Sequence, residues 1–268
     1  MPDLRTVKDR VAKADAANGG GLRMTKKVDA AVKQMVTKKV NPRQQWQVVL
    51  LADRSGSMGN EYRNGSVQDA VERALGFAVI VDDDGSVPTI FFDHRLQQVD
   101  VSLDNYSDLI RRERIDAYGS TGLTEALVRA AEITGNGDLF SGGGFFKRGA
   151  SSPTKKKADI PVFLFVVTDG VPNDPQSAAD AIRKLSYRGV FIKFLYVGND
   201  RSGWQFLESL DDDIPVGVPY EQGGRLVDNV DAKQMADLRS ASDDTFYEAM
   251  LDEVPTYLTT ARQNELLA

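Results

Sequence analysis

Cysteine is absent from the 268-residue sequence, and histidine occurs only once, at position 94. Without cysteine the chain can form no disulfide framework and no thiolate metal site, which fits a reducing compartment. His94 follows Phe91-Phe92-Asp93, and we interpret it as a loop residue at the end of a strand. No Ser-His-Asp nucleophile set is apparent, because His94 is the single candidate base.

Long hydrophobic runs are absent as well. No stretch approaches the roughly 18 apolar residues of a membrane-spanning helix. The N-terminal segment MPDLRTVKDR has no apolar core of the kind that signal peptides contain. Hydrophobic residues make up 41% of the chain and charged residues 27%, as in ordinary globular proteins. We therefore expect a cytoplasmic protein with one large domain and appendages.

The net charge of −6 conceals an uneven distribution. Residues 1–45 carry 11 Lys and Arg against 4 Asp and Glu, a balance of +7; the remainder carries 22 against 35, a balance of −13. A basic arm of this kind can contact nucleic acid or an anionic membrane. Because no aromatic residues are interleaved with its charges, we favour packing of the arm on the acidic body.

Helical and strand patterns alternate along the chain after residue 45. Apolar residues at helical spacing predict helices, and short apolar runs predict strands. Thr25 is expected to cap the second helix, and Asp243 or Asp244 the last one, which ends or bends near Pro255. The predicted helices span residues 3–17, 25–39, 66–81, 105–114, 123–134, 175–188, 203–210 and 245–267. The predicted strands span residues 46–52, 87–92, 161–167 and 190–197.

This alternation predicts an α/β fold, in which a doubly wound, mostly parallel β-sheet is flanked by helices. Residues 1–44 are expected to form a basic helical N-terminal extension, and residues 45–268 the main domain, with a C-terminal helix at about 245–267. The Gly-rich, basic stretch 135–158 shows no period and is too long for an ordinary connection. We expect it to be an insertion that limited proteolysis cuts first.

The most informative stretch is residues 48–57, which read VVLLADRSGS. Its four bulky apolar residues show no polar alternation, which is typical of a strand buried on both faces. The strand ends in a small polar turn that begins with Asp53 and contains Ser55 and Ser57. In open α/β sheets, ligands bind outside the carboxyl ends of the strands.

Two further segments supply oxygen ligands at the same predicted edge. Thr121 precedes the 123–134 helix, and Asp169 follows the strand 161–167. Together with Asp53, Ser55 and Ser57 they offer five side-chain oxygens and no nitrogen or sulfur. Such a set suits Mg²⁺, or alternatively Ca²⁺ or Mn²⁺, rather than zinc or copper.

The pattern resembles the metal-ion-dependent adhesion site (MIDAS) of von Willebrand factor A (vWA) domains. Its elements here are Asp53-x-Ser55-x-Ser57, then Thr121, then Asp169-Gly170. The resemblance covers about 46–230, and extension to the end of the chain is the alternative. More narrowly, DRSGSM, NGSVQDAVERALGFAVIVDDDGSVPTIFFD and SLDNY resemble the vWA domain of bacterial tellurium-resistance, TerF-like stress proteins.

This resemblance implies a vWA/Rossmann-like fold and a role in protein binding rather than catalysis. The hydroxyls of Ser55, Ser57 and Thr121 would contact the metal directly, and Asp53 and Asp169 would act through water. A partner protein, with other Ter-type stress proteins as candidates, would supply an Asp or Glu carboxylate as the remaining ligand. The resemblance also implies a place in a stress or tellurium-resistance system.

Each site residue also has a purely structural interpretation. Asp53 could form a turn or cap a helix, and Ser55 and Ser57 could be ordinary turn residues. Thr121 could cap the following helix with reinforcement from Glu125, and Thr124 is a rival cap and a lesser rival ligand. Asp169-Gly170 could likewise be a simple turn.

Two other functions compete with protein binding. A metal-dependent phosphohydrolase is one, but the residue two positions after Asp53 is Ser55, whereas an aspartyl-phosphate mechanism normally needs an acid or base there. A scaffold that binds nucleic acid or anionic membrane through the basic extension is the other. Two weaker signals, the acidic turn 82–84 and the Gly-rich stretch 142–148, lack the features of an EF-hand and of a P-loop.

Overall fold

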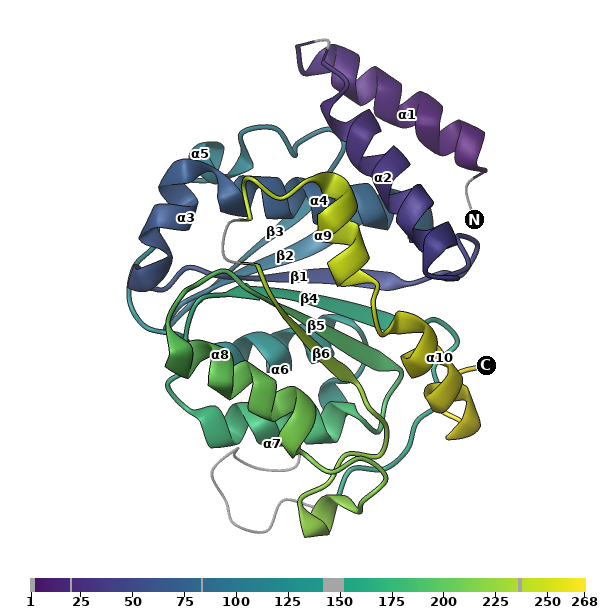
Figure 1. The fold of residues 1–268 in the computed structure, drawn as a ribbon, viewed down its shortest axis with the longest axis vertical. Helices are drawn as coiled ribbons and strands as arrows, with labels where there is room; N and C mark the ends of the chain where they lie inside the picture. The colour runs from purple at the N-terminus through teal and green to yellow at the C-terminus, as the bar shows by residue number, and fades with distance from the viewer. Residues whose placement is uncertain (1–2, 20, 83, 142–151, 236–237) are drawn as a thin grey trace.

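The computed structural model describes residues 3–19, 21–82, 84–141, 152–235 and 238–268. These form a mostly parallel six-stranded sheet in the order β3-β2-β1-β4-β5-β6, with helices on both faces (Figure 1). Only the β2–β3 pair is antiparallel in this sheet. The predicted fold class is thereby confirmed. The strands are β1 (Gln47–Asp53), β2 (Ser86–Phe92), β3 (Leu96–Ser102), β4 (Val162–Thr168), β5 (Val190–Tyr196) and β6 (Val230–Gln234).

The helices form two layers. Helices α6, α7 and α8 cover one face of the sheet, and α4 and α9 cover the other, beneath the N-terminal pair (Figure 1). The helices are α1 (Leu4–Ala17), α2 (Arg23–Thr37), α3 (Gly59–Asn64), α4 (Ser66–Val81), α5 (Leu109–Arg112), α6 (Leu123–Ile133), α7 (Pro175–Leu185), α8 (Arg201–Glu208), α9 (Asp243–Met250) and α10 (Val254–Gln263). Helix α4 has the bounds predicted from its apolar spacing.

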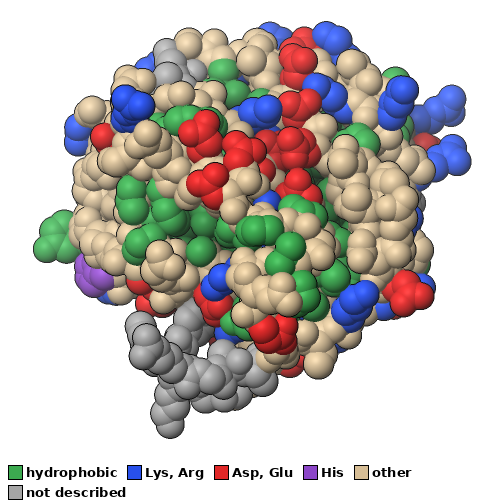
Figure 2. All heavy atoms as spheres, turned by 60° about the horizontal axis from the view of Figure 1, so that its bottom comes forward, with side chains coloured by type: hydrophobic (Ala, Val, Ile, Leu, Met, Phe, Trp, Pro, Cys, Tyr) green, Lys and Arg blue, Asp and Glu red, His purple; other side chains and the backbone are tan. Residues whose placement is uncertain are grey.

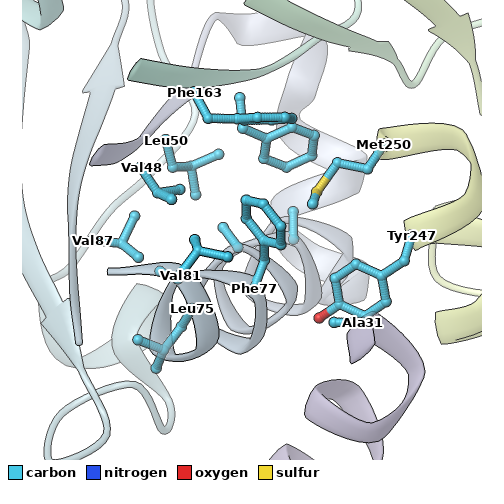
Figure 3. Close-up of a cluster of buried hydrophobic side chains, with 14 of the residues drawn as sticks. Ala31, Val48, Leu50, Leu75, Phe77, Val81, Val87, Phe163, Tyr247 and Met250 are labelled. Atoms are coloured by element: carbon cyan, nitrogen blue, oxygen red, sulfur yellow. The ribbon is translucent and has the colours of Figure 1, made fainter. Parts of the chain in front are cut away.

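Strand β1 lies at the centre because it is apolar on both faces. Its even-numbered residues join the core under α4, and Val49 and Leu51 join the core under α6 and α7. Figure 3 shows how the first of these cores is assembled from the sheet, α4 and α9. The side chains that meet there include Val48, Leu50, Phe77, Val81, Phe163, Tyr247 and Met250. Burial of β1 from Val48 to Asp53 fixes where its carboxyl end, and therefore the polar turn, leaves the sheet.

Two edge strands, β3 and β6, were not predicted from the sequence. β3 alternates exposed and half-buried residues from Leu96 to Asp100 and buries only Val101. β6 reads VDAKQ, with only two apolar residues. Neither carries an apolar run, so each is defined by its pairing with a central neighbour. The helix expected at 105–114 shortens to α5, because the Asn105 side chain accepts from the Ser102 amide and donates to the Asp100 carbonyl, which holds a turn there.

The C-terminal helix predicted at 245–267 is two helices, α9 and α10. Pro255 lies in the first turn of α10, where its missing N–H leaves no hydrogen bond unmade. The α9 N-cap is Ser242, whose hydroxyl accepts from the Thr245 amide, so the expected Asp243 or Asp244 cap is wrong. Of the segment 135–158, positions 142–151 lie outside the described residues; a 3₁₀ turn, Gly137–Phe140, precedes them.

The basic N-terminal helices pack on the acidic body, as the charge balance indicated. Met24, Val28 and Met35 are buried in the same core as α4 and α9. Lys27 Nζ lies 3.3 Å from an Asp69 carboxylate oxygen, and similar pairs join Lys33 to Asp244 and Lys38 to Asp252. Acidic side chains also gather near the middle of the face drawn in Figure 2. Much of the positive charge on α2 is therefore engaged within the chain.

The N-terminus of helix α2 is capped by a side chain from another helix, α1. Asp15 of α1 is 3% exposed, and its carboxylate accepts from the backbone amides of Met24 and Thr25, each at 2.9 Å, and from the Thr25 hydroxyl at 2.7 Å. The N-cap residue is Leu22, which contributes no side-chain bond. Thr25 is therefore not the cap; a carboxylate from the preceding helix performs that role.

We expect Asp15→Ala to lower the free energy of unfolding by about 1–2 kcal/mol, because two amides at the start of α2 lose their acceptor. Urea unfolding followed by circular dichroism measures this. Asp9→Ala is the matched control, since Asp9 is an exposed carboxylate on the same helix. Equal losses in both variants would show that the cap contributes nothing.

Among the residues that the structure describes, no helix is both long enough and apolar enough to cross a membrane.

Candidate metal centre

Asp53 is the last residue of β1 and is completely buried. One carboxylate oxygen accepts from the Ser55 amide at 2.7 Å, and the other accepts from the Thr168 hydroxyl at 2.6 Å. Burial raises the pKa of Asp53 to about 6, although both hydrogen bonds oppose this shift. The carboxylate is thus held rigidly at the carboxyl end of the sheet, in a site where a nearby cation would favour its charged form.

Ser55 and Ser57 enter the same site through a tight turn. Residues Gly56–Met58 form a 3₁₀ turn directly after the strand, which brings the two hydroxyl oxygens to 3.1 Å. Ser55 is 3% exposed, whereas Ser57 faces solvent. We call the loops at the carboxyl edge of the sheet around these oxygens the rim of the site. The alternate spacing of the two serines therefore places the Ser55 hydroxyl inside the rim and the Ser57 hydroxyl at its solvent-exposed side.

Asp169 follows β4, the neighbour of β1. Its carboxylate accepts from the Ser57 hydroxyl at 2.8 Å, across a sequence separation of 112 residues. Partial burial raises the pKa of Asp169, and the bond from Ser57 opposes this shift. This hydrogen bond joins the first and last parts of the predicted oxygen set.

Thr121 lies on the third segment of the rim and is 7% exposed. A Cβ added at Gly170 would lie 4.0 Å from the Thr121 hydroxyl oxygen, and the Thr121 carbonyl accepts from the Asn173 amide at 2.9 Å. The N-cap of α6 is Gly122, and no side chain caps this helix. The capping interpretation of Thr121, with Glu125 or with Thr124 as a rival, is therefore wrong.

The structure thus brings Asp53, Ser55, Ser57, Thr121 and Asp169 to one edge of the sheet. Hydrogen bonds connect Asp53 to Ser55, Ser55 to Ser57, and Ser57 to Asp169. Thr121 lies beside the turn that carries Asp169. Three hydroxyls and two carboxylates form an all-oxygen donor set, which fits a hard divalent cation. Within the described ranges, no group of three or more His, Cys, Asp or Glu is arranged to hold a metal. A centre with only two carboxylates would not produce such a group.

Three supporting residues, Thr168, Arg54 and Asp93, were not predicted from the sequence. Thr168 donates to Asp53, and Asp93, at the end of β2, pairs with Arg54 through a 3.2 Å contact to its guanidinium. The Asp93 side chain is 1% exposed, and its other oxygen accepts from the Arg95 amide at 2.6 Å. The position of Thr168, directly before Asp169 at the end of β4, was the sequence feature from which its role beside the site could have been predicted. Nothing local indicated that Arg54 and Asp93 would meet.

His94 lies on the same rim but outside the oxygen set. Its side chain is 46% exposed, with Nδ1 3.4 Å from an Asp93 oxygen and the ring 6.1 Å from that of Tyr118. Gly119, with φ +84°, passes so close that an added Cβ would lie 2.4 Å from His94 Nδ1. A glycine is required there both for the positive φ and for this approach. Gly119 in turn accepts from the Gly56 amide at 3.0 Å, which links the third segment to the serine turn.

Comparison with known proteins gives three findings. Residues 45–267 match the model of the family described as vWA-TerF-like, the vWA domain found in the TerF C terminus. The uncharacterized protein YcbR of Bacillus subtilis is 27% identical over 243 residues, which cover 88% of this chain and 87% of YcbR. The crystal structure of the manganese-loaded TRAP protein of Plasmodium vivax is 17% identical, with a TM-score of 0.43, over 78% of this chain and 72% of that one.

Proposed function

Since the chain belongs to the family of vWA domains found at the C terminus of TerF, we propose that it is a metal-dependent protein-binding module. The observation that carries the proposal is the hydrogen-bonded set of Ser55, Ser57 and Asp169, with Asp53 buried beneath it. The cofactor we propose is Mg²⁺, with Mn²⁺ or Ca²⁺ as alternatives.

The residues divide by charge and exposure. The neutral hydroxyls of Ser55, Ser57 and Thr121 would contact the cation, and Asp53 and Asp169 would act through water. In this arrangement a bound divalent cation keeps much of its positive charge uncompensated and supplies a position for an anionic ligand. The rim residue Ser57 is exposed, so that position would face outward.

The partner we propose is a protein that presents an Asp or Glu carboxylate at this rim. Other Ter-type stress proteins are candidates, and a role in stress or tellurium resistance is proposed from the family's name. The chain's own contribution is to hold five oxygens in place before the partner arrives, which lowers the entropic cost of binding.

An aspartyl-phosphate enzyme is the weaker alternative. Both carboxylate oxygens of Asp53 accept hydrogen bonds in a fully buried position, which leaves the group poorly placed to attack a phosphoester. We expect the purified protein with Mg²⁺ or Mn²⁺ to release no phosphate from p-nitrophenyl phosphate or nucleotides. Turnover that disappears in Asp53→Asn would establish the enzyme instead.

The scaffold alternative is weakened by the ion pairs of α2. Lys27, Lys33 and Lys38 all contact carboxylates of the main domain. Deletion of residues 1–44 would also uncover the core beneath α2, so it is a poor test. Binding of the intact protein to DNA or to anionic vesicles that weakens steeply with salt would favour the scaffold.

Affinity capture from the native host tests the proposal. With Mg²⁺ the wild-type protein should retain a specific partner, and EDTA or the Ser57→Ala substitution should release it. Ser120→Ala is the matched control, because Ser120 is an exposed serine of the same rim outside the oxygen set. Retention of the same partner in EDTA and by Ser57→Ala would refute a metal-bridged contact.

A further inference from the structure

A cavity of about 310 Å³ lies beside the candidate metal centre, outside its oxygen set. It is bounded by Leu96 at the start of β3, by one side of α6 from Thr124 to Glu132, and by Asp174 at the N-cap of α7. The two sites are linked through neighbouring residues, since the amide of Asn173, which precedes the cavity residue Asp174, donates to the Thr121 carbonyl.

Two buried polar atoms in the wall of this cavity lack partners. Thr124 is 4% exposed, and its hydroxyl oxygen makes no hydrogen bond with any described residue. The same holds for one buried carboxylate oxygen of Asp174, which does not cap its own helix. A buried oxygen without a partner costs free energy, so both atoms favour a ligand that donates hydrogen bonds.

The remaining wall combines apolar surface with negative charge. Leu96 and Val128 supply the apolar part, and Glu125 and Glu132 add carboxylates. The one basic residue, Arg129, is engaged with the Gln98 amide oxygen at 3.1 Å and with Glu132 at 3.0 Å. The cavity therefore has an apolar side for an aliphatic chain and an acidic side for a cation.

We propose that this cavity binds the side chain of a lysine from a protein partner. The four-carbon stem would lie along Leu96 and Val128, and the ammonium group would donate to the Thr124 hydroxyl and the Asp174 carboxylate. Lysine fits better than arginine, because a compact ammonium needs few acceptors, whereas a guanidinium presents five donors in a planar fork. Binding at this site needs no metal, so it adds a second contact to the proposed function.

Methyl NMR of the full chain tests the proposal, with Nα-acetyl-lysine amide as the probe. The probe should produce saturable shifts of the Leu96 and Val128 methyl signals in the presence of EDTA. Asp174→Asn and Thr124→Val should weaken its binding, the former by about tenfold, because each removes or weakens an acceptor for the ammonium group. Asp104→Asn is the matched control, since it removes one exposed carboxylate that does not line this cavity.

Three outcomes would overturn the lysine assignment. The neutral Nα-acetyl-norleucine amide binding as well as the lysine probe would leave only an apolar groove. Tighter binding of Nα-acetyl-arginine amide would contradict the choice of cation. Unchanged binding by Asp174→Asn would mean that this carboxylate does not contact the probe. Because EDTA is present throughout, none of these results depends on whether the metal centre exists.

Discussion

Titration of Mg²⁺ or Mn²⁺ into the Asp169→Ala variant should give no measurable heat, whereas the wild-type protein should bind one divalent ion. Asp169 holds the Ser57 hydroxyl at 2.8 Å, so its removal deletes one carboxylate and releases a second oxygen of the set. Loss of such an outer carboxylate should weaken metal affinity by about 10- to 100-fold. Isothermal titration calorimetry measures this directly.

Asp53→Ala should abolish metal binding as well, but it carries a second cost. Asp53 is fully buried, and its removal leaves the Thr168 hydroxyl and the Ser55 amide without their acceptor. That loss should lower the free energy of unfolding by about 1–3 kcal/mol. Circular dichroism and urea unfolding therefore accompany the titration, so that loss of the site is distinguished from loss of the fold.

Ser120→Ala provides the matched control, because it alters an exposed hydroxyl of the same rim. Its affinity for Mg²⁺ should equal that of the wild-type protein. Unchanged affinity in both Asp169→Ala and Asp53→Ala would defeat the assignment of the metal centre to this edge of the sheet.

Lys193→Met should be among the most destabilising single substitutions in this chain, with a loss of about 3–5 kcal/mol at pH 8. Lys193 on β5 and Asp231 on β6 face each other in register, form an ion pair, and have side chains 0% and 1% exposed. Without the ammonium group, the Asp231 carboxylate would stay buried and uncompensated. Chemical unfolding at constant pH measures the loss.

Neighbouring acids make the effect depend on pH. Burial, with Asp231 and Asp211 adding repulsion, raises the pKa of Glu253 to about 7, and Lys193 opposes that shift. A carboxyl group whose pKa is raised by folding favours the folded state at low pH, and this contribution is lost as the pH rises toward its folded pKa. Removal of Lys193 strengthens this trend, so the loss in Lys193→Met should be larger at pH 8 than at pH 5.

The double variant Lys193→Met/Asp231→Leu is the matched control. It removes both charges and keeps side chains of similar bulk, and replacement of a buried ion pair in this way is often neutral or stabilising. Its stability should return close to that of the wild-type protein. A double variant as unstable as Lys193→Met would show that packing, rather than an unpaired buried charge, causes the loss.

The central strands and their helices were predictable because their signals are local. β1 and β4 are apolar on both faces, and β5 is apolar apart from Lys193. Helix α4 carries a continuous apolar stripe, so each of these elements can be recognised from a few neighbouring residues. The edge strands β3 and β6 carry no such pattern, and they were missed. The caps were predicted wrongly at Thr25 and at Asp243 or Asp244, because the start of α2 takes its acceptor from another helix and α9 is capped by Ser242.

The candidate metal residues were also legible in the sequence, for a different reason. A polar turn at the end of an apolar strand places its side chains at the ligand-binding edge of an open sheet, whatever the rest of the chain does. Residue types and their order along the chain therefore sufficed to nominate Asp53, Ser55, Ser57, Thr121 and Asp169.

By itself, then, the sequence determined the strand-and-helix alternation, the buried central strand and the oxygen-rich edge, since these depend on hydrophobic period and residue type. Only the tertiary structure decided which side chains from different elements form hydrogen bonds and ion pairs with one another. The Ser57–Asp169 bond, the Asp15 cap of α2 and the Lys193–Asp231 pair each join residues on different elements. Such contacts form when packing brings distant segments together, and no local pattern of residues encodes them.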